Sequence, residues 1–129
     1  MHAAIWVTIG AVIGGMARFW ISGLVARRMG ETFPWGTLLV NISGSFVIGL
    51  AATFGGQGAD AIGGPTVRLF LTTGICGGYT TFSSFSLQTL NLAREGEWVP
   101  AAGNVILSVV LCILAAYLGI LAGTALTPH

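Results

Sequence analysis

The stretch GICGGYTTFSSFSLQT, residues 74–89, decides the fold because it places glycines and hydroxyl groups inside an otherwise apolar segment. Gly74, Gly77 and Gly78 have no Cβ, so the backbone can leave helical geometry there. The hydroxyl-rich run that follows predicts a helix restarting within the segment. A broken helix at membrane depth exposes carbonyl oxygens, and it is tolerated only where protein or water covers it. The stretch therefore predicts an ion-binding break.

On the helix that restarts after this break, residues at three- and four-residue spacing form two neighbouring strips along the helix surface. The first strip carries Phe82, Phe85 and Thr89, and the strip beside it carries Thr81, Ser84 and Gln88. We expect the rings and the hydrogen-bond donors to share one wall. A phenyl ring has a positive edge, and hydroxyl and amide donors replace water around an anion without adding a fixed charge. This wall suits a small, hard anion, although hydroxyls can also bond their own backbone and rings can simply pack.

The composition indicates an integral membrane protein. Of 129 residues, 54% are hydrophobic and only 7% are charged, whereas soluble domains carry roughly 25% charged residues. The chain has no lysine and a net charge of +1. Nucleic-acid binding is therefore excluded as a function class.

Four segments are long and apolar enough to cross a bilayer, which takes about 20 residues. They cover residues 3–26, 36–54, 68–92 and 99–126. We therefore predict an all-α fold, with residues 1–129 forming a single four-helix membrane domain whose third helix is broken. An even number of spans places both termini on one side of the membrane.

Four helices fill the centre of their own bundle with side chains and leave little room for an aqueous path. We therefore expect the chain to form an oligomer. Two pairs of glycines at four-residue spacing suit close helix contact. They are Gly10 with Gly14 in the first span and Gly119 with Gly123 in the fourth. We expect these small-residue faces to form the interface between subunits.

Polar residues inside the first two spans extend the candidate pathway. A charge inside a span is costly, so Arg18 should line a wet vestibule, unless it merely reaches the lipid headgroups. In the second span Thr37, Asn41 and Ser45 share one face at four-residue spacing. This face can exchange hydrogen bonds along the membrane normal, while Asn41 can alternatively bond two helices together.

The fourth span carries Asn104 and Ser108 at helical spacing. These two residues extend a polar strip into a pore or form contacts between helices, and the spacing is compatible with both. Cys76 and Cys112 lie in apolar segments with no zinc-binding spacing, which predicts small packing residues.

Basic residues give only a weak preference for orientation. Arg27, Arg28 and Arg94 fall on one predicted face of the membrane, against Arg68 on the other. The basic side is usually cytoplasmic. A bias this small leaves open insertion in both orientations.

Three pieces of the sequence, taken together, resemble one known family. They are GGMARFW with Arg18, PWGTLLVNISGSFVIG with Asn41, and GICGGYTTFSSFS in the third span. In order and spacing the chain resembles the Fluc (CrcB) family of small fluoride channels over essentially its whole length. The resemblance implies a passive, highly selective fluoride channel in the bacterial inner (plasma) membrane, not an enzyme, that exports fluoride and relieves its toxicity.

The resemblance also implies an assembly and a set of site residues. The assembly is a dual-topology homodimer of two inverted subunits in the lipid bilayer, with a sodium ion held at its centre by the backbone carbonyls of Gly77 and Thr80. Oxygen ligands suit such a hard cation. The implied fluoride pathway comprises Asn41, Phe82, Phe85, Thr37, Ser83, Ser84, Ser108 and Arg18.

Two residues depart from the family pattern. Gln88 stands where many relatives are expected to carry glutamate, and Asn104 stands where some carry a pore-side tyrosine. These differences affect the expected hydrogen-bond chain through the pathway.

Two alternative functions stay open. A small multidrug-type exporter also has four spans, but it would need a carboxylate within its first span, and every Asp and Glu of this chain lies in a connection. A structural membrane subunit would use the glycines and hydroxyls only for helix association. An enzyme is disfavoured, since both histidines, His2 and His129, lie at the chain ends and no pairing of nucleophile and base is evident.

Overall fold

The computed structural model describes residues 2–56 and 65–126, and all regular structure within those ranges is helical. The elements are α1 (His2–Met29), α2 (Trp35–Gly56), α3 (Pro65–Leu69), the π-helix η2 (Phe70–Cys76), α4 (Gly77–Tyr79), α5 (Phe82–Arg94) and α6 (Trp98–Leu126). Within the described residues, three helices are long and apolar enough to cross a membrane: α1, α2 and α6. The predicted all-α membrane fold is confirmed to that extent.

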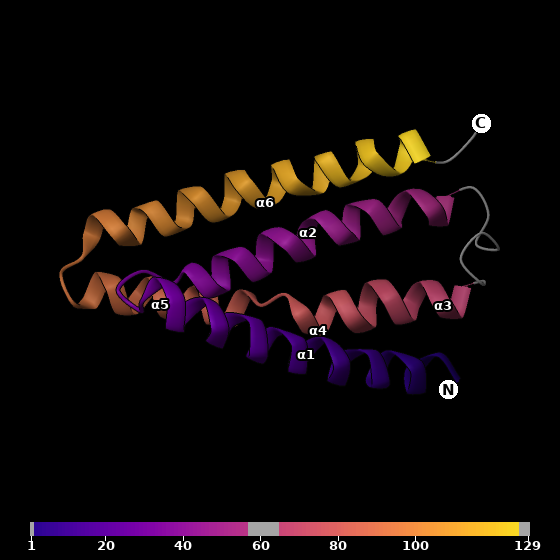
Figure 1. The fold of residues 1–129 in the computed structure, drawn as a ribbon, viewed down its shortest axis with the longest axis horizontal. Helices are drawn as coiled ribbons and strands as arrows, with labels where there is room; N and C mark the ends of the chain where they lie inside the picture. Colours follow the sequence, from indigo (N-terminus) through magenta and orange to yellow (C-terminus); the bar gives the residue numbers. More distant parts are fainter. Residues whose placement is uncertain (1, 57–64, 127–129) are drawn as a thin grey trace.

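The helices run side by side along one long axis (Figure 1). Helix α2 packs along α6, whereas α1 packs against η2, α4 and α2, and α5 contacts α6. Helix α1 begins and α6 ends at the same end of the molecule, as predicted. The connections from α1 to α2 and from α5 to α6 lie together at the other end.

Glycines in left-handed conformation end two of these helices. Gly30 has φ 85° after α1, and Gly96 has φ 81° after α5. The Gly30 N–H donates to the Ala26 carbonyl at 2.9 Å, and the Gly96 N–H donates to the Ala93 carbonyl at 3.1 Å. Only glycine adopts such a φ without strain, which is why helices commonly end at it.

The segment from residue 65 to residue 94 is a broken helical rod, and its break differs in position from the prediction. Gly77 and Gly78 are helical, whereas Thr80 and Thr81 are extended, with ψ of 156° and 117°. Helix α5 then restarts at Phe82, because the Thr81 hydroxyl accepts the Ser84 N–H at 3.1 Å and caps the new helix. The break therefore lies just beyond the glycines.

The glycines of this segment allow α1 to approach closely. A Cβ on Gly74 would lie 3.1 Å from the Gly10 Cα, and a Cβ on Gly78 would lie 2.9 Å from the Ala11 Cα. The contact at Gly78 is closer than real Cβ atoms show, and the contact at Gly74 is tighter than nine in ten of theirs. These glycines serve packing within the chain.

The expectation that the paired glycines of the first and fourth spans face a second subunit is wrong. Gly10 and Gly14 pack against the backbone of η2 and α4, with the Gly14 Cα facing the Ile75 carbonyl. Gly119 packs against the α2 backbone at Phe46 and Leu50, and Gly123 packs against the Thr53 side chain of α2. Close approach of two helices explains these pairs, and here both helices belong to one chain.

Large apolar side chains cover the outside of the helices. Phe19 is 80% exposed, and Val99 is 83% exposed. A soluble domain rarely shows such an extended apolar surface. These side chains suit contact with lipid.

Candidate functional site

Asn41 of α2 closes the break in the third segment. Its Nδ2 donates to the Thr81 carbonyl at 3.0 Å, and its Oδ1 accepts the Thr81 N–H at 2.8 Å. Extended Thr81 has no helical acceptor for its N–H, and the Asn41 Oδ1 takes that place. The Thr81 carbonyl, at the N-cap of α5, accepts the first hydrogen bond of that helix and the Asn41 bond in addition. We call the two bonds between Asn41 and Thr81 the Asn41 clasp. The Asn41 Nδ2 carries two protons, and the one that does not bond Thr81 can be donated to another acceptor.

Arg18 of α1 supports the break from the opposite helix. Its Nε donates to the Gly78 carbonyl at 3.3 Å. The side chain is half-buried, and it lines a cavity at the end of the bundle that holds the interhelical connections. This placement agrees with the vestibule reading of Arg18.

The carbonyls of Gly77 and Thr80 lose their helical donors at the break. In a continuous helix the Thr81 N–H would donate to Gly77, and the Ser84 N–H would donate to Thr80. The Thr81 N–H instead donates to Asn41, and the Ser84 N–H donates to the Thr81 hydroxyl. Both carbonyl oxygens belong to residues that line a second cavity.

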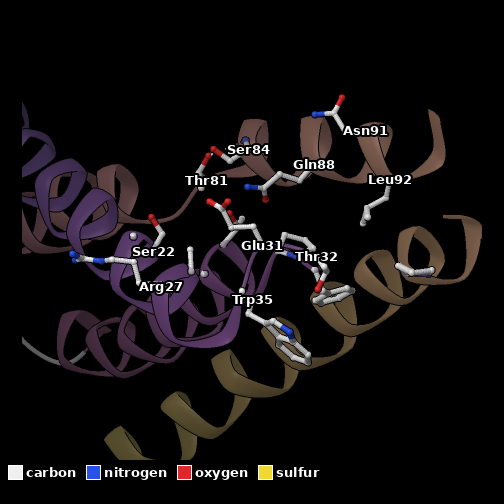
Figure 2. A pocket seen from close by; sticks show the side chains of 18 of the residues that line it. Ser22, Arg27, Glu31, Thr32, Trp35, Thr81, Ser84, Gln88, Asn91 and Leu92 are labelled. Atoms are coloured by element: carbon white, nitrogen blue, oxygen red, sulfur yellow. Dashed lines mark hydrogen bonds between the residues drawn. The ribbon is translucent and has the colours of Figure 1, made fainter. Parts of the chain in front are cut away.

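The first cavity, which we call the vestibule, has a volume of about 1610 Å³ and is shown in Figure 2. Three predicted site residues line it, namely Arg18, Thr37 and Ser84. Its charged lining residues are Arg18, Arg27, Glu31, Glu95 and Glu97. The polar lining and size suit a water-filled entrance.

Gln88 lies in the wall of the vestibule, one helical turn beyond Ser84 (Figure 2). Its Oε1 is buried and has no hydrogen-bond partner among the described residues. A carboxamide can present either end in such a place. Gln88 thus offers the vestibule a neutral polar group.

The second cavity, which we call the groove, has a volume of about 390 Å³ and lies between α2, α6 and the broken segment. Predicted site residues from all three sides line it: Asn41, Gly77, Thr80, Phe82, Phe85 and Ser108. The rings of Phe82 and Phe85 are 5.3 Å apart at an interplanar angle of 47°. The groove therefore brings aromatic edges, an amide and hydroxyls into one space.

The two strips of α5 face different cavities, so the prediction of a single wall is wrong. Phe82 and Phe85 line the groove, whereas Ser84 and Gln88 line the vestibule. A helical strip one position away points about 100° round the axis. The polar partners of the rings in the groove come instead from α2, α6 and the extended residues.

Thr81 lines both cavities, and the sequence reasoning left it outside the candidate pathway. Its hydroxyl caps α5 and also lies 3.2 Å from the hydroxyl of Ser83. Ser83 itself is exposed. The signal that identifies Thr81 is its position directly before the helix that restarts, where threonine is a favoured cap.

Asn104 is the most buried polar side chain of α6, at 1% exposure. Its Nδ2 donates to the Thr89 hydroxyl of α5 at 2.8 Å, and its Oδ1 accepts the Ser108 hydroxyl at 3.4 Å. Of the two readings that the sequence allowed, contact between helices holds for Asn104. Ser108 lines the groove.

Both cysteines line the groove as free thiols. Cys76 is buried, which agrees with the predicted packing role. Among the described residues, no cluster of three or more His, Cys, Asp or Glu side chains suits a metal ion.

Known proteins resemble this chain over nearly its full length. Residues 5–120 match the family described as "CrcB-like protein, Camphor Resistance (CrcB)". A protein of Methylocella silvestris named fluoride-specific ion channel FluC is 55% identical over 115 residues, which are 89% of this chain and 88% of that protein. The protein of the same name from Opitutus terrae is 52% identical over 98% of this chain and 96% of its own length.

A third relative, fluoride-specific ion channel FluC 2 of Rhodopseudomonas palustris, is 53% identical over 126 residues, which are 98% of this chain and 96% of that protein. The family match, over residues 5–120, spans α2 and the broken segment and most of α1 and α6. On this agreement of sequence, the chain belongs to the CrcB family.

Proposed function

We propose that the chain is a passive, selective fluoride channel and not an enzyme. One observation carries the proposal most directly: the groove gathers Asn41, Ser108 and the ring pair Phe82 and Phe85 in a single cavity. The names of the relatives, which describe fluoride-specific ion channels, support the same function.

Fluoride is small and strongly hydrated, so it enters a protein only where donors replace its water. The second Nδ2 proton of Asn41 and the hydroxyl of Ser108 are such donors, and the positive edges of Phe82 and Phe85 add electrostatic attraction without a fixed charge. Uncharged donors bind the anion firmly enough to admit it and weakly enough to release it. A narrow space with donors spaced for a small ion disfavours chloride.

The vestibule supplies the route from water to the groove. Arg18 contributes a positive charge there, while Thr37 and Ser84 contribute hydroxyls. Thr81 lines both cavities, so the proposed path from the vestibule to the groove runs past the Asn41 clasp. Ser83, beside Thr81, belongs to the same polar approach.

The proposed arrangement in the membrane has four spans, the third being the broken segment 65–94. Two inverted copies form a homodimer in the bacterial inner membrane, where each copy covers the exposed groove of the other. Phe82 supports this arrangement, because it is 78% exposed in a single chain although it borders polar groups. The excess of arginines on one face is only two, which permits insertion in both orientations.

A sodium ion at the centre of such a dimer would be held by the carbonyls of Gly77 and Thr80 from each copy. The fit is chemical: both oxygens have lost their helical donors, and hard cations prefer oxygen ligands. When bound, the ion would tie the two breaks together and offset part of the repulsion between anions nearby.

A proton-coupled exporter and a structural subunit remain the alternatives. Glu31, Glu95 and Glu97 lie in the connections beside the vestibule and outside the long helices. An exporter that cycles protons needs an ionisable group at its substrate site. The groove offers neutral donors, which favours passive conduction.

Fluoride release from liposomes that contain the purified protein tests the proposal. A fluoride electrode and a chloride electrode should record rapid fluoride release with little chloride release. Folded dimer that releases no fluoride would refute the channel, and release that requires a proton gradient would favour an exporter.

A further inference from the structure

A chain of hydrogen bonds links the groove to helix α5 through the buried Asn104. Ser108 donates to the Asn104 Oδ1 at 3.4 Å, the Asn104 Nδ2 donates to the Thr89 hydroxyl at 2.8 Å, and Thr89 donates to the Phe85 carbonyl at 2.7 Å. One end of the chain is a groove hydroxyl, and the other is the backbone of a groove phenylalanine.

The direction of these bonds determines what Ser108 offers to the groove. A hydroxyl has one proton and two lone pairs. Because the Ser108 proton points to Asn104, its lone pairs are what remain for the groove. An anion at the groove must therefore draw this proton away from Asn104 before Ser108 can donate to it.

Asn104 is 1% exposed, so bulk water does not readily supply a second donor to its Oδ1. When Ser108 turns to an anion, the Oδ1 is left buried without its proton donor, and this costs free energy. The bond of 3.4 Å is long, so the cost is modest. Asn104 thus competes with the anion without excluding it.

We infer that Asn104 is a positioning residue that lowers the fluoride affinity of the groove and thereby speeds release of the ion. This inference rests on the proposed fluoride channel and names a determinant of its affinity. Conduction needs a site that the ion can leave, and competition for one hydroxyl proton provides that property without a repulsive charge.

The test is the dependence of fluoride efflux on fluoride concentration in liposomes. In Asn104→Leu, whose side chain has the same number and branching of heavy atoms, Ser108 is free to donate. We expect the half-saturating fluoride concentration to fall about two- to five-fold, as loss of one weak competing bond implies. The maximal rate should fall as well, because the ion leaves more slowly.

Three further variants separate this role from a structural one. Thr89→Val removes the bond between α5 and α6 but keeps the bond between Ser108 and Asn104, so its half-saturating concentration should equal that of the wild type. Ser108→Ala should raise that concentration. Asn104→Leu combined with Ser108→Ala should match Ser108→Ala alone, since the effect of Asn104 acts through the hydroxyl.

Asn104→Thr provides a second route if the leucine variant does not fold, because a threonine hydroxyl can bond its own helix. It should show the same fall in half-saturating concentration. An unchanged or raised value in the folded variants, with wild-type fluoride efflux intact, overturns this inference alone. Wild-type protein that carries no fluoride overturns the proposed function and this inference with it.

Discussion

The Asn41 clasp gives the sharpest prediction about the break. Asn41→Leu keeps the number and branching of the side-chain heavy atoms but removes both bonds to Thr81, at 3.0 and 2.8 Å. A buried backbone group that loses its partner costs about 1 to 3 kcal/mol. Only the Thr81 N–H is left without a partner, because the carbonyl keeps its bond within α5, and Thr81 is half-buried. We therefore expect the free energy of unfolding to fall by about 1 to 2 kcal/mol.

Chemical denaturation in detergent without fluoride measures this change. In the absence of fluoride, Asn41 cannot stabilise the protein by binding the anion, so only its bonds to Thr81 contribute. Ser45→Ala is the matched control, because Ser45 lies one turn further along α2 and lines the same groove. Its hydroxyl bonds to the Cys112 thiol, which is a weak hydrogen-bond partner, so this change should alter stability by less than about 0.5 kcal/mol. An Asn41→Leu protein as stable as this control would refute the argument.

Three further predictions concern the backbone at the break and its surroundings. Gly44→Ala puts a Cβ against the Thr80 methyl group. Overpacking of this kind costs about 1 to 3 kcal/mol, and we expect fluoride efflux to fall sharply. The control Gly15→Ala, whose added Cβ meets open space, should leave efflux unchanged. Gly30→Ala should destabilise the protein by about 1 kcal/mol because φ is 85° there, while efflux per folded dimer stays the same. Arg18→Gln should slow fluoride efflux most at low ionic strength, because salt screens the positive charge that the substitution removes. An efflux loss of the same size at every salt concentration would mean that Arg18 acts only through its hydrogen bond to the Gly78 carbonyl.

The sequence was sufficient to predict the features that depend on local pattern. Apolar length predicted α1, α2 and α6 with ends within a few residues of those observed. Helical spacing on α5 correctly grouped Phe82 with Phe85, and Ser84 with Gln88. These features follow from periodicity, which the chain carries in its residue order.

The features that the sequence could not supply depend on partners distant in the chain. Asn41 could be assigned to a polar face, but its partner is the backbone of Thr81, and backbone groups have no residue signature. The paired glycines predicted close helix contact correctly, yet spacing alone does not say which helix they contact. The π-helix η2 likewise has no recognised pattern in its residues.

Fluoride efflux of Phe82→Ile, compared with the wild type, tests the central claim that the groove conducts the ion. Phe46→Ile is the matched control, because Phe46 is an exposed phenylalanine of α2 that does not line the groove. We predict that Phe82→Ile nearly abolishes fluoride release while Phe46→Ile retains it, with both proteins dimeric and folded. Wild-type release in Phe82→Ile would contradict the account, because the ion would then pass without the ring edge that the groove provides.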